Sequence, residues 1–115
     1  MKVTIYHNPR CSKSRATLAL LREHGIEPQV VEYLVTAPDA ATLRRLLKAL
    51  GMKPRQLLRT KEAAYKDKRL ERAQVTDAEI IDAMVHHPVL IERPIVVAGS
   101  RATIGRPPEQ VLEIL

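Results

Sequence analysis

The sequence predicts an α/β fold with the order β-α-β, a helical insert, and then β-β-α. Alternating apolar residues at Val3 and Ile5 indicate a first strand, and a second short apolar strand follows at residues 30–33. Between them, residues 12–24 are rich in Ala and Leu, and Gly25 ends this predicted helix because glycine adopts the left-handed backbone readily. A strand, a helix and a strand at this spacing form a parallel βαβ unit with a right-handed crossover.

The middle of the chain is predicted to be helical. One apolar stripe at helical spacing ends before Gly51 and consists of Leu43, Leu46, Leu47 and Leu50. Pro54 is typical of the first position of a short helical turn. The charged residues 61–72 indicate a solvated helix or loop. The segment 76–79 has the sequence of a capping box, which begins a further helix that ends before Pro88.

The C-terminal part predicts a hairpin and a last helix. Two β-rich segments, 95–97 and 102–104, flank a small turn, which is the pattern of an antiparallel hairpin. We expect the buried side of the last helix to consist of Val111, Leu112 and Leu115. No linker or repeat interrupts the chain, so we expect a single domain over residues 1–115.

Composition narrows the classes of partner. The chain has 115 residues and a net charge of +6, but its Lys and Arg residues are spread along the sequence. Its aromatic residues are three tyrosines, so we expect no base-stacking surface and no nucleic acid partner. An excess of arginine suits small oxyanions equally well. No signal segment or membrane-spanning run is visible, so we expect a cytoplasmic protein with no membrane partner.

The one cysteine, Cys11, lies at the predicted junction of the first strand and the first helix. The N-terminus of a helix lowers the pKa of a thiol, and nearby positive charges and hydroxyl groups do the same. Such groups are supplied in the sequence by Arg10, Lys13, Arg15, Ser12 and Ser14. The alternative is a cysteine that serves as a small buried hydrophobe, which these flanking residues disfavour. We therefore expect Cys11 to be a nucleophile, and any second thiol to come from another molecule.

The order of elements is that of a thioredoxin-like (glutaredoxin-like) domain. Such domains place a reactive cysteine at the start of the first helix and a proline, commonly cis, at the start of the third strand. Cys11 and Pro94 occupy these places in the sequence.

Several segments give the chain a resemblance to the ArsC family, the glutaredoxin-dependent arsenate reductases and their close paralogues. The resemblance runs from Thr4 to Leu115. The matching segments follow in order: Tyr6-His7-Asn8-Pro9 with Cys11, Leu57-Leu58-Arg59, His87-Pro88, Arg93-Pro94-Ile95-Val96-Val97 and Arg106-Pro107. The active-site loop with Arg10 and residues 12–14 is similar to that of a paralogous branch of putative arsenate reductases.

The resemblance implies an arsenate reductase activity. Cys11 would attack arsenate, or a similar small oxyanion, and form a covalent thioarsenate that glutathione and glutaredoxin reduce to arsenite. No cofactor would be bound, and glutathione would be an external co-substrate. The implied oxyanion-binding residues are Arg59, Arg93 and Arg106. The implied thiolate-supporting residues are His7, Asn8 and Ser14.

The site residues have structural alternatives in the sequence. Arg59 could interact with the end of a helix, and Arg93 and Arg106, each before a proline, could be ordinary loop residues. His86 and His87 indicate capping or packing at a helix end. We expect no metal site, because no second pair of ligands has metal-site spacing.

Two other functions are compatible with the fold. A redox regulator resembling the Spx proteins, which bind RNA polymerase, would carry a Cys-x-x-Cys switch, whereas position 14 is Ser. A monothiol glutaredoxin-like transferase could act through Cys11 alone, but the three arginines are surplus to that role. The sequence favours the oxyanion reductase over both.

Overall fold

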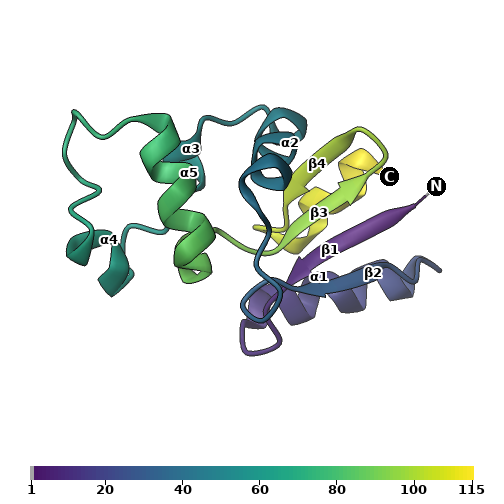
Figure 1. The fold of residues 1–115 in the computed structure, drawn as a ribbon. Coiled ribbons are helices and arrows are strands. Elements are labelled where there is room, and N and C mark those ends of the chain that lie inside the picture. The colour runs from purple at the N-terminus through teal and green to yellow at the C-terminus, as the bar shows by residue number, and fades with distance from the viewer. Residues whose placement is uncertain (1) are drawn as a thin grey trace. The chain divides into compact units, whose positions relative to one another are not determined.

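The structure is a computed structural model that describes residues 2–115, which form two compact units (Figure 1). One unit consists of the residues up to Thr36 together with Arg93–Leu115, and the other is Ala37–Glu92. A single domain over residues 1–115 stays a prediction, because this division does not show whether either unit folds alone.

The first unit is built on a four-stranded sheet in the order β2-β1-β3-β4 (Figure 1). Strands β1 (Val3–His7) and β2 (Gln29–Glu32) are parallel and are connected by α1 (Ser12–Glu23). Strand β3 (Ile95–Ala98) is antiparallel to both β1 and β4 (Arg101–Ile104). The predicted βαβ unit and the predicted hairpin are confirmed.

The core of this unit lies between the sheet, α1 and the 3₁₀ helix η2 (Pro108–Ile114). Burial of such side chains stabilises the fold by about 1.5–3 kcal/mol each. The buried cluster comprises Val3, Ile5, Leu21, Val96, Ala98, Val111 and Ile114. This packing fixes α1 against β1 and β3, and so fixes the position of Cys11, the residue that precedes α1.

The predicted C-terminal helix differs in type and in its buried face. Val111 and Ile114 are buried, whereas Leu112 is 36% exposed. A 3₁₀ helix has three residues per turn, so residues three apart share a face. The α-helical spacing that placed Leu112 on the buried side was therefore the wrong period for this segment.

The second unit is helical, as predicted. Its elements are α2 (Ala40–Leu50), α3 (Pro54–Leu57), α4 (Ala63–Asp67), α5 (Asp77–His86) and the 3₁₀ helix η1 (Pro88–Leu90). Helix α2 ends at Gly51, whose φ of 68° is left-handed. The predicted capping box at α5 is confirmed: the Thr76 hydroxyl accepts from the Glu79 N–H at 3.2 Å, and the Glu79 carboxylate accepts from the Thr76 N–H at 3.0 Å.

The segments 57–59 and 90–92 of the second unit pair through their backbones. Residues 58 and 91 form an isolated antiparallel bridge. The Arg59 N–H donates to the Leu90 carbonyl at 2.8 Å. The Glu92 N–H donates to the Leu57 carbonyl at 3.0 Å. These bonds fix the backbone positions from which Arg59 and Glu92 project.

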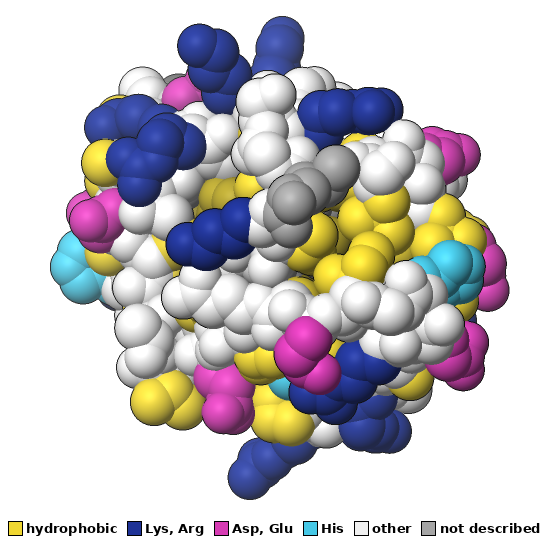
Figure 2. Space-filling model, turned by 90° about the vertical axis from the view of Figure 1, so that its right-hand side faces the viewer, with side chains coloured by type: hydrophobic (Ala, Val, Ile, Leu, Met, Phe, Trp, Pro, Cys, Tyr) yellow, Lys and Arg dark blue, Asp and Glu magenta, His cyan; other side chains and the backbone are white. Residues whose placement is uncertain are grey.

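The surface shows charged and apolar side chains intermixed. On the face in Figure 2 the Lys and Arg side chains lie at several places, some of them next to one another, and acidic and hydrophobic side chains are exposed on the same face. Among residues 2–115, no helix combines the length and the hydropathy that crossing a membrane requires.

Candidate active site

Cys11 occupies the N-cap position of α1, as the sequence predicts for a reactive thiol. Its backbone is extended (φ −92°, ψ 123°) and its carbonyl accepts from the Arg15 N–H at 3.0 Å, which closes the first helical turn. The residue is 8% exposed. The thiol is therefore held at the positive end of the helix dipole, with a small opening to solvent.

The pKa of the Cys11 thiol is lowered in the folded chain. Burial raises it, but the backbone N–H groups of Ser14 and Lys13, and then the hydrogen bond and charge of Arg93, outweigh burial. The sulfur makes no regular capping hydrogen bond, so these N–H groups favour the thiolate as dipoles at the end of the helix. The result is a thiol with more thiolate character than a free cysteine.

The sources of this shift differ in part from those expected from the sequence. The positive charge that acts on the sulfur is that of Arg93 rather than that of Arg10, Lys13 and Arg15. The Arg15 guanidinium is turned away to the Pro9 carbonyl, to which it donates at 2.9 Å. A basic residue next to a cysteine in sequence does not have to face it, because the course of the loop sets the direction of each side chain.

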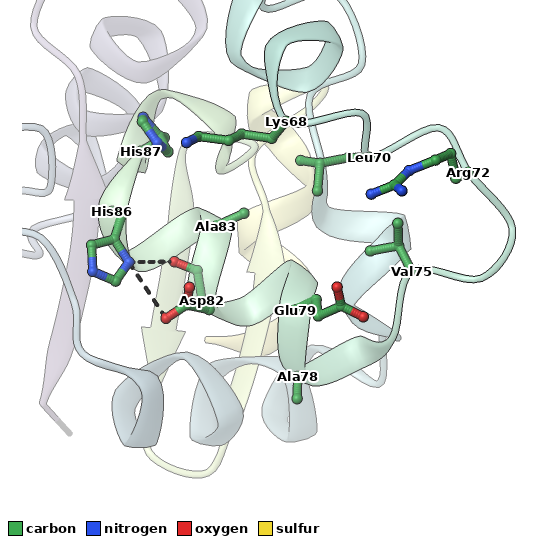
Figure 3. A pocket seen from close by; sticks show the side chains of 10 residues that line it. All are labelled: Lys68, Leu70, Arg72, Val75, Ala78, Glu79, Asp82, Ala83, His86 and His87. Atoms are coloured by element: carbon green, nitrogen blue, oxygen red, sulfur yellow. Dashed lines mark hydrogen bonds and ion pairs between the residues drawn. The ribbon is translucent and has the colours of Figure 1, made fainter.

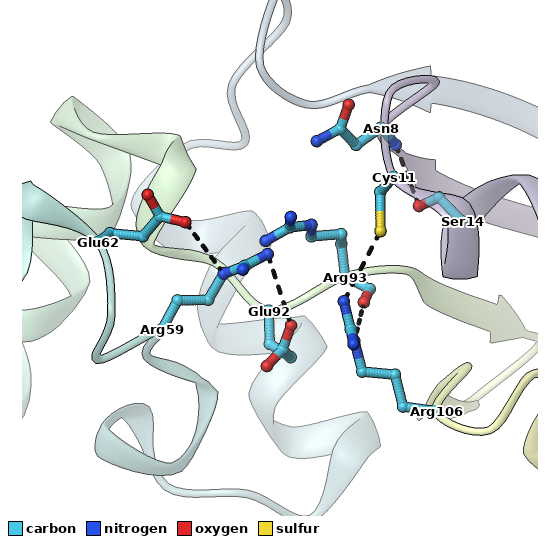
Figure 4. Close-up of polar contacts among 8 residues, drawn as sticks. All are labelled: Asn8, Cys11, Ser14, Arg59, Glu62, Glu92, Arg93 and Arg106. Carbon is cyan, nitrogen blue, oxygen red and sulfur yellow. Dashed lines mark hydrogen bonds and ion pairs between the residues drawn. The ribbon is translucent and has the colours of Figure 1, made fainter.

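Asn8 and Ser14 shape the loop that carries the thiol (Figure 4). The Asn8 N–H donates to the Ser14 hydroxyl at 3.2 Å, and the Asn8 carbonyl accepts from the Cys11 N–H at 3.0 Å. The Asn8 side-chain oxygen accepts from the Arg10 N–H at 3.0 Å. The Ser14 hydroxyl thus accepts from the loop backbone, whereas the sequence suggested that it donates to the sulfur. Its backbone N–H acts on the thiol instead.

Arg106 reaches the sulfur of Cys11 (Figure 4), and Arg93 acts on it through a hydrogen bond and its charge. Nη2 of Arg106 lies 3.6 Å from the sulfur, and Nε of Arg106 donates to the Arg93 carbonyl at 2.8 Å. Each of these arginines precedes a cis proline, Pro94 or Pro107. The structure therefore brings the thiol together with two of the three predicted oxyanion ligands.

His7 lies at the end of β1, paired in register with Glu32 of β2. It is buried, and its Nδ1 has no hydrogen-bond partner among residues 2–115. Burial lowers the pKa of His7, as do the charges of Arg22 and Arg15, against an opposing effect of Glu32. The ring is therefore favoured in its neutral form, and a role of His7 in supporting the thiolate stays a prediction.

Arg59, the third predicted oxyanion ligand, belongs to the second unit. Its guanidinium forms ion pairs with Glu62 and Glu92 (Figure 4). The alternative suggested by the sequence, that Arg59 interacts with the end of a helix, is not tested by these ion pairs. Its role toward an oxyanion stays a prediction.

Comparison with known proteins places this site in a family. The sequence matches the ArsC family over residues 6–114. The chain belongs to the ArsC family.

Two curated relatives illustrate the range of the ArsC family around this chain. The chain is 61% identical over 115 residues to the uncharacterized protein YfgD of Escherichia coli (strain K12). The alignment covers 99% of this chain and 97% of that protein. The chain is 50% identical over 116 residues to an arsenate reductase of Haemophilus influenzae, and the alignment covers 100% of both proteins.

A solved structure agrees with this family assignment. An arsenate reductase from Vibrio cholerae has 55% sequence identity and a TM-score of 0.98, with 100% of this chain and 98% of that chain covered. The predicted thioredoxin-like fold is confirmed by this match.

One residue of this ArsC chain beside the site, Thr17, was not singled out in the sequence. Thr17 is fully buried on the face of α1 that also buries Ser14 and Leu21. Its hydroxyl donates to the Lys13 carbonyl at 2.8 Å and lies 3.5 Å from the Gly105 carbonyl. A polar residue three positions after Ser14, within an apolar helical stripe, is the signal that could have identified Thr17.

A hollow of about 520 Å³ lies in the second unit, bordered by α5 and residues 68–75 (Figure 3). It contains none of the predicted site residues. His86 at its edge is engaged with its own helix, since its Nδ1 lies 2.9 Å from the Asp82 carbonyl oxygen and 3.4 Å from the Asp82 carboxylate. In the described chain, no three His, Cys, Asp or Glu side chains are grouped so that they could hold a metal ion.

Proposed function

We propose that this chain is an arsenate reductase in which the Cys11 thiolate attacks the arsenic of arsenate. The observation that carries the proposal is the surroundings of the sulfur, on which two helix N–H groups and the Arg93 and Arg106 side chains act. Attack on an oxyanion needs an ionised nucleophile and positive charge to offset that of the anion, and this arrangement supplies both. The relatives named arsenate reductase, at 50% and 55% identity, support arsenate as the oxyanion.

The first step forms a bond between the Cys11 sulfur and As(V), and one arsenate oxygen leaves as water after gaining protons. Arsenic stays As(V) in this thioarsenate, so no electrons have yet been transferred. Arg93 and Arg106 would bind the remaining oxygens, together with Arg59, and offset the charge that develops during displacement. Asn8 and Ser14 keep the loop, and with it the sulfur, in the position for attack.

Reduction needs two electrons, and the chain contains one cysteine. We propose that glutathione bonds to the arsenic with loss of a second water, and that glutaredoxin attacks the glutathione sulfur. The mixed disulfide then leaves, and its formation reduces As(V) to As(III). Water releases arsenite and restores the Cys11 thiol. Glutathione is therefore a co-substrate, and no bound cofactor takes part.

The test is arsenate-dependent oxidation of NADPH in the presence of glutathione, glutaredoxin and glutathione reductase. We expect turnover with the wild-type chain, none with Cys11→Ser, and none when glutathione or glutaredoxin is omitted. A wild-type chain without an arsenate-dependent rate would refute the substrate. A rate that survives in Cys11→Ser would refute the nucleophile.

A further inference from the structure

Arg59 is held between two carboxylates of its own unit (Figure 4). Its Nε lies 3.3 Å from Oε1 of Glu62, and its Nη1 lies 3.9 Å from Oε1 of Glu92. The side chain of Arg59 is 20% exposed, that of Glu62 is 26% exposed and that of Glu92 is 30% exposed. With both carboxylates ionised, the group carries one net negative charge, which opposes an approaching anion rather than attracting it.

The three residues project from points that the backbone fixes. Arg59 is the last residue of the paired segment 57–59, and Glu92 is the last residue of 90–92. Glu62 is the N-cap residue of α4. Partly buried side chains on such fixed points lose less freedom on pairing than exposed ones, so these ion pairs carry more weight than most surface pairs.

The carboxylates compensate the charge of Arg59 without completing its hydrogen bonds. Nη1 is buried and has no hydrogen-bond partner among the described residues, since 3.9 Å is too long for one. A buried guanidinium N–H without an acceptor is unfavourable. An oxyanion that reaches this nitrogen would complete the bond, because the planar guanidinium binds oxyanions with two parallel N–H groups.

We propose that Glu62 and Glu92 form a carboxylate clamp that holds Arg59 in the anion-free protein and competes with an oxyanion for it. The inference rests on the proposed function for the role of Arg59 as an oxyanion ligand. The two glutamates are positioning residues that act through Arg59. The clamp sets the affinity of the site and favours an oxyanion of lower charge over one of higher charge, because each added negative charge is repelled by both carboxylates.

The test measures binding of sulfate to the whole chain by titration calorimetry at low ionic strength. Sulfate is a dianion that the thiol cannot reduce through the proposed steps, so binding is separated from turnover. In both Glu62→Gln and Glu92→Gln we expect sulfate to bind on the order of tenfold more tightly than in the wild type, which is a Coulomb effect reduced by partial exposure. The gain should shrink as salt is added.

Two controls separate the clamp from a general change in charge. Glu27→Gln removes a carboxylate from the Arg22–Glu27 ion pair, whose side chains are 53% and 71% exposed, and should change sulfate binding by less than about twofold. In an Arg59→Ala background, Glu62→Gln should tighten sulfate binding much less than in the wild type, because only the direct repulsion between the carboxylate and sulfate then remains. In arsenate turnover, Glu62→Gln should lower KM while kcat stays within about twofold.

The clamp is overturned if sulfate binding is absent, unchanged or weaker in both glutamate variants. It is also overturned if Glu27→Gln gives the same gain, or if the gain in Glu62→Gln is undiminished without Arg59. Failure of the proposed function gives a different pattern: no arsenate turnover in the wild type, together with tighter sulfate binding in the variants. Arsenate turnover with unchanged sulfate binding would remove the clamp alone.

Discussion

We predict that a single methyl group at Gly105 damages both the stability of the first unit and the thiol site. The backbone of Gly105 does not require glycine, because its φ lies outside the left-handed region. Space is what excludes a side chain. A Cβ at this position would lie 2.5 Å from Oγ1 of Thr17 and 2.9 Å from Cγ of Pro94.

The expected magnitude follows from these distances. The contact with Thr17 is about 0.9 Å short of the 3.4 Å at which ordinary van der Waals contact begins. Thr17 has little freedom to move away, because it is fully buried and its hydroxyl donates to the Lys13 carbonyl at 2.8 Å. Overpacking of this kind costs about 1–3 kcal/mol. The lower entropy of an unfolded chain with alanine offsets about 0.4–1 kcal/mol, so we expect Gly105→Ala to lower the free energy of unfolding by about 1–2 kcal/mol.

The second effect concerns the thiol. Gly105 precedes Arg106, whose Nη2 lies 3.6 Å from the Cys11 sulfur. A displaced Arg106 stabilises the thiolate less, so the pKa of Cys11 should rise. Alkylation by iodoacetamide at pH 7 should then slow, because the thiolate is the form that reacts.

The assay is urea unfolding followed by circular dichroism for the wild type, Gly105→Ala, Thr17→Ala and the double variant. Thr17→Ala removes both Thr17 atoms that approach the new Cβ. The double variant should therefore lose about 1 kcal/mol less than the sum of the single variants. Additive losses, or a Gly105→Ala chain as stable as the wild type, would refute the steric argument.

Two further predictions concern the thiol and the second unit. The pKa of Cys11 is lower in the folded chain than in the unfolded chain, so the thiolate contributes stability that is complete above the unfolded value of about 8.5 and is lost as the pH falls through the folded value. The free energy of unfolding of the wild type, measured against that of Cys11→Ser, should therefore rise between pH 6 and pH 9, and a constant difference would contradict the lowered pKa. Thr76→Ala removes the hydroxyl that accepts from the Glu79 N–H and should lower the free energy of unfolding by about 1 kcal/mol in urea. Ser100→Ala, in the exposed turn after β3, is the matched control and should stay within about 0.5 kcal/mol of the wild type; equal losses would exclude the cap as the cause.

Much of the fold could be predicted because its signals are local. The alternation in β1, the capping box at Thr76 and the left-handed glycines at 25 and 51 each report on a few consecutive residues. The type of the last helix could not be predicted in this way. Over seven residues a period of three and a period of 3.6 are difficult to tell apart from the apolar residues alone, and the structure separates them by the exposure of Leu112 and the burial of Ile114.

The site could be predicted less completely, because its charges come from distant parts of the chain. The start of α1 marked Cys11 as a thiol with a lowered pKa, and the structure agrees. The cations that face the sulfur, however, are separated from it by more than eighty residues, whereas the basic neighbours of Cys11 in sequence do not supply the charge. Composition and spacing carry no information on such a contact. The resemblance to the ArsC family indicated Arg93 and Arg106 as site residues, whereas the pattern of residues alone did not.

The two kinds of donor at the sulfur have different consequences for chemistry. Arg93 lowers the pKa of the thiol and Arg106 contacts the sulfur. Both are also residues proposed to bind the oxyanion. A bound anion therefore offsets part of the positive charge that favours the thiolate. The backbone N–H groups of Lys13 and Ser14 are not taken up by the anion in this scheme, so they keep the sulfur ionised when the arginines are occupied. Activation of the nucleophile thus depends on the helix terminus at the moment of attack, and Asn8 and Ser14 matter because they hold that terminus and the sulfur together.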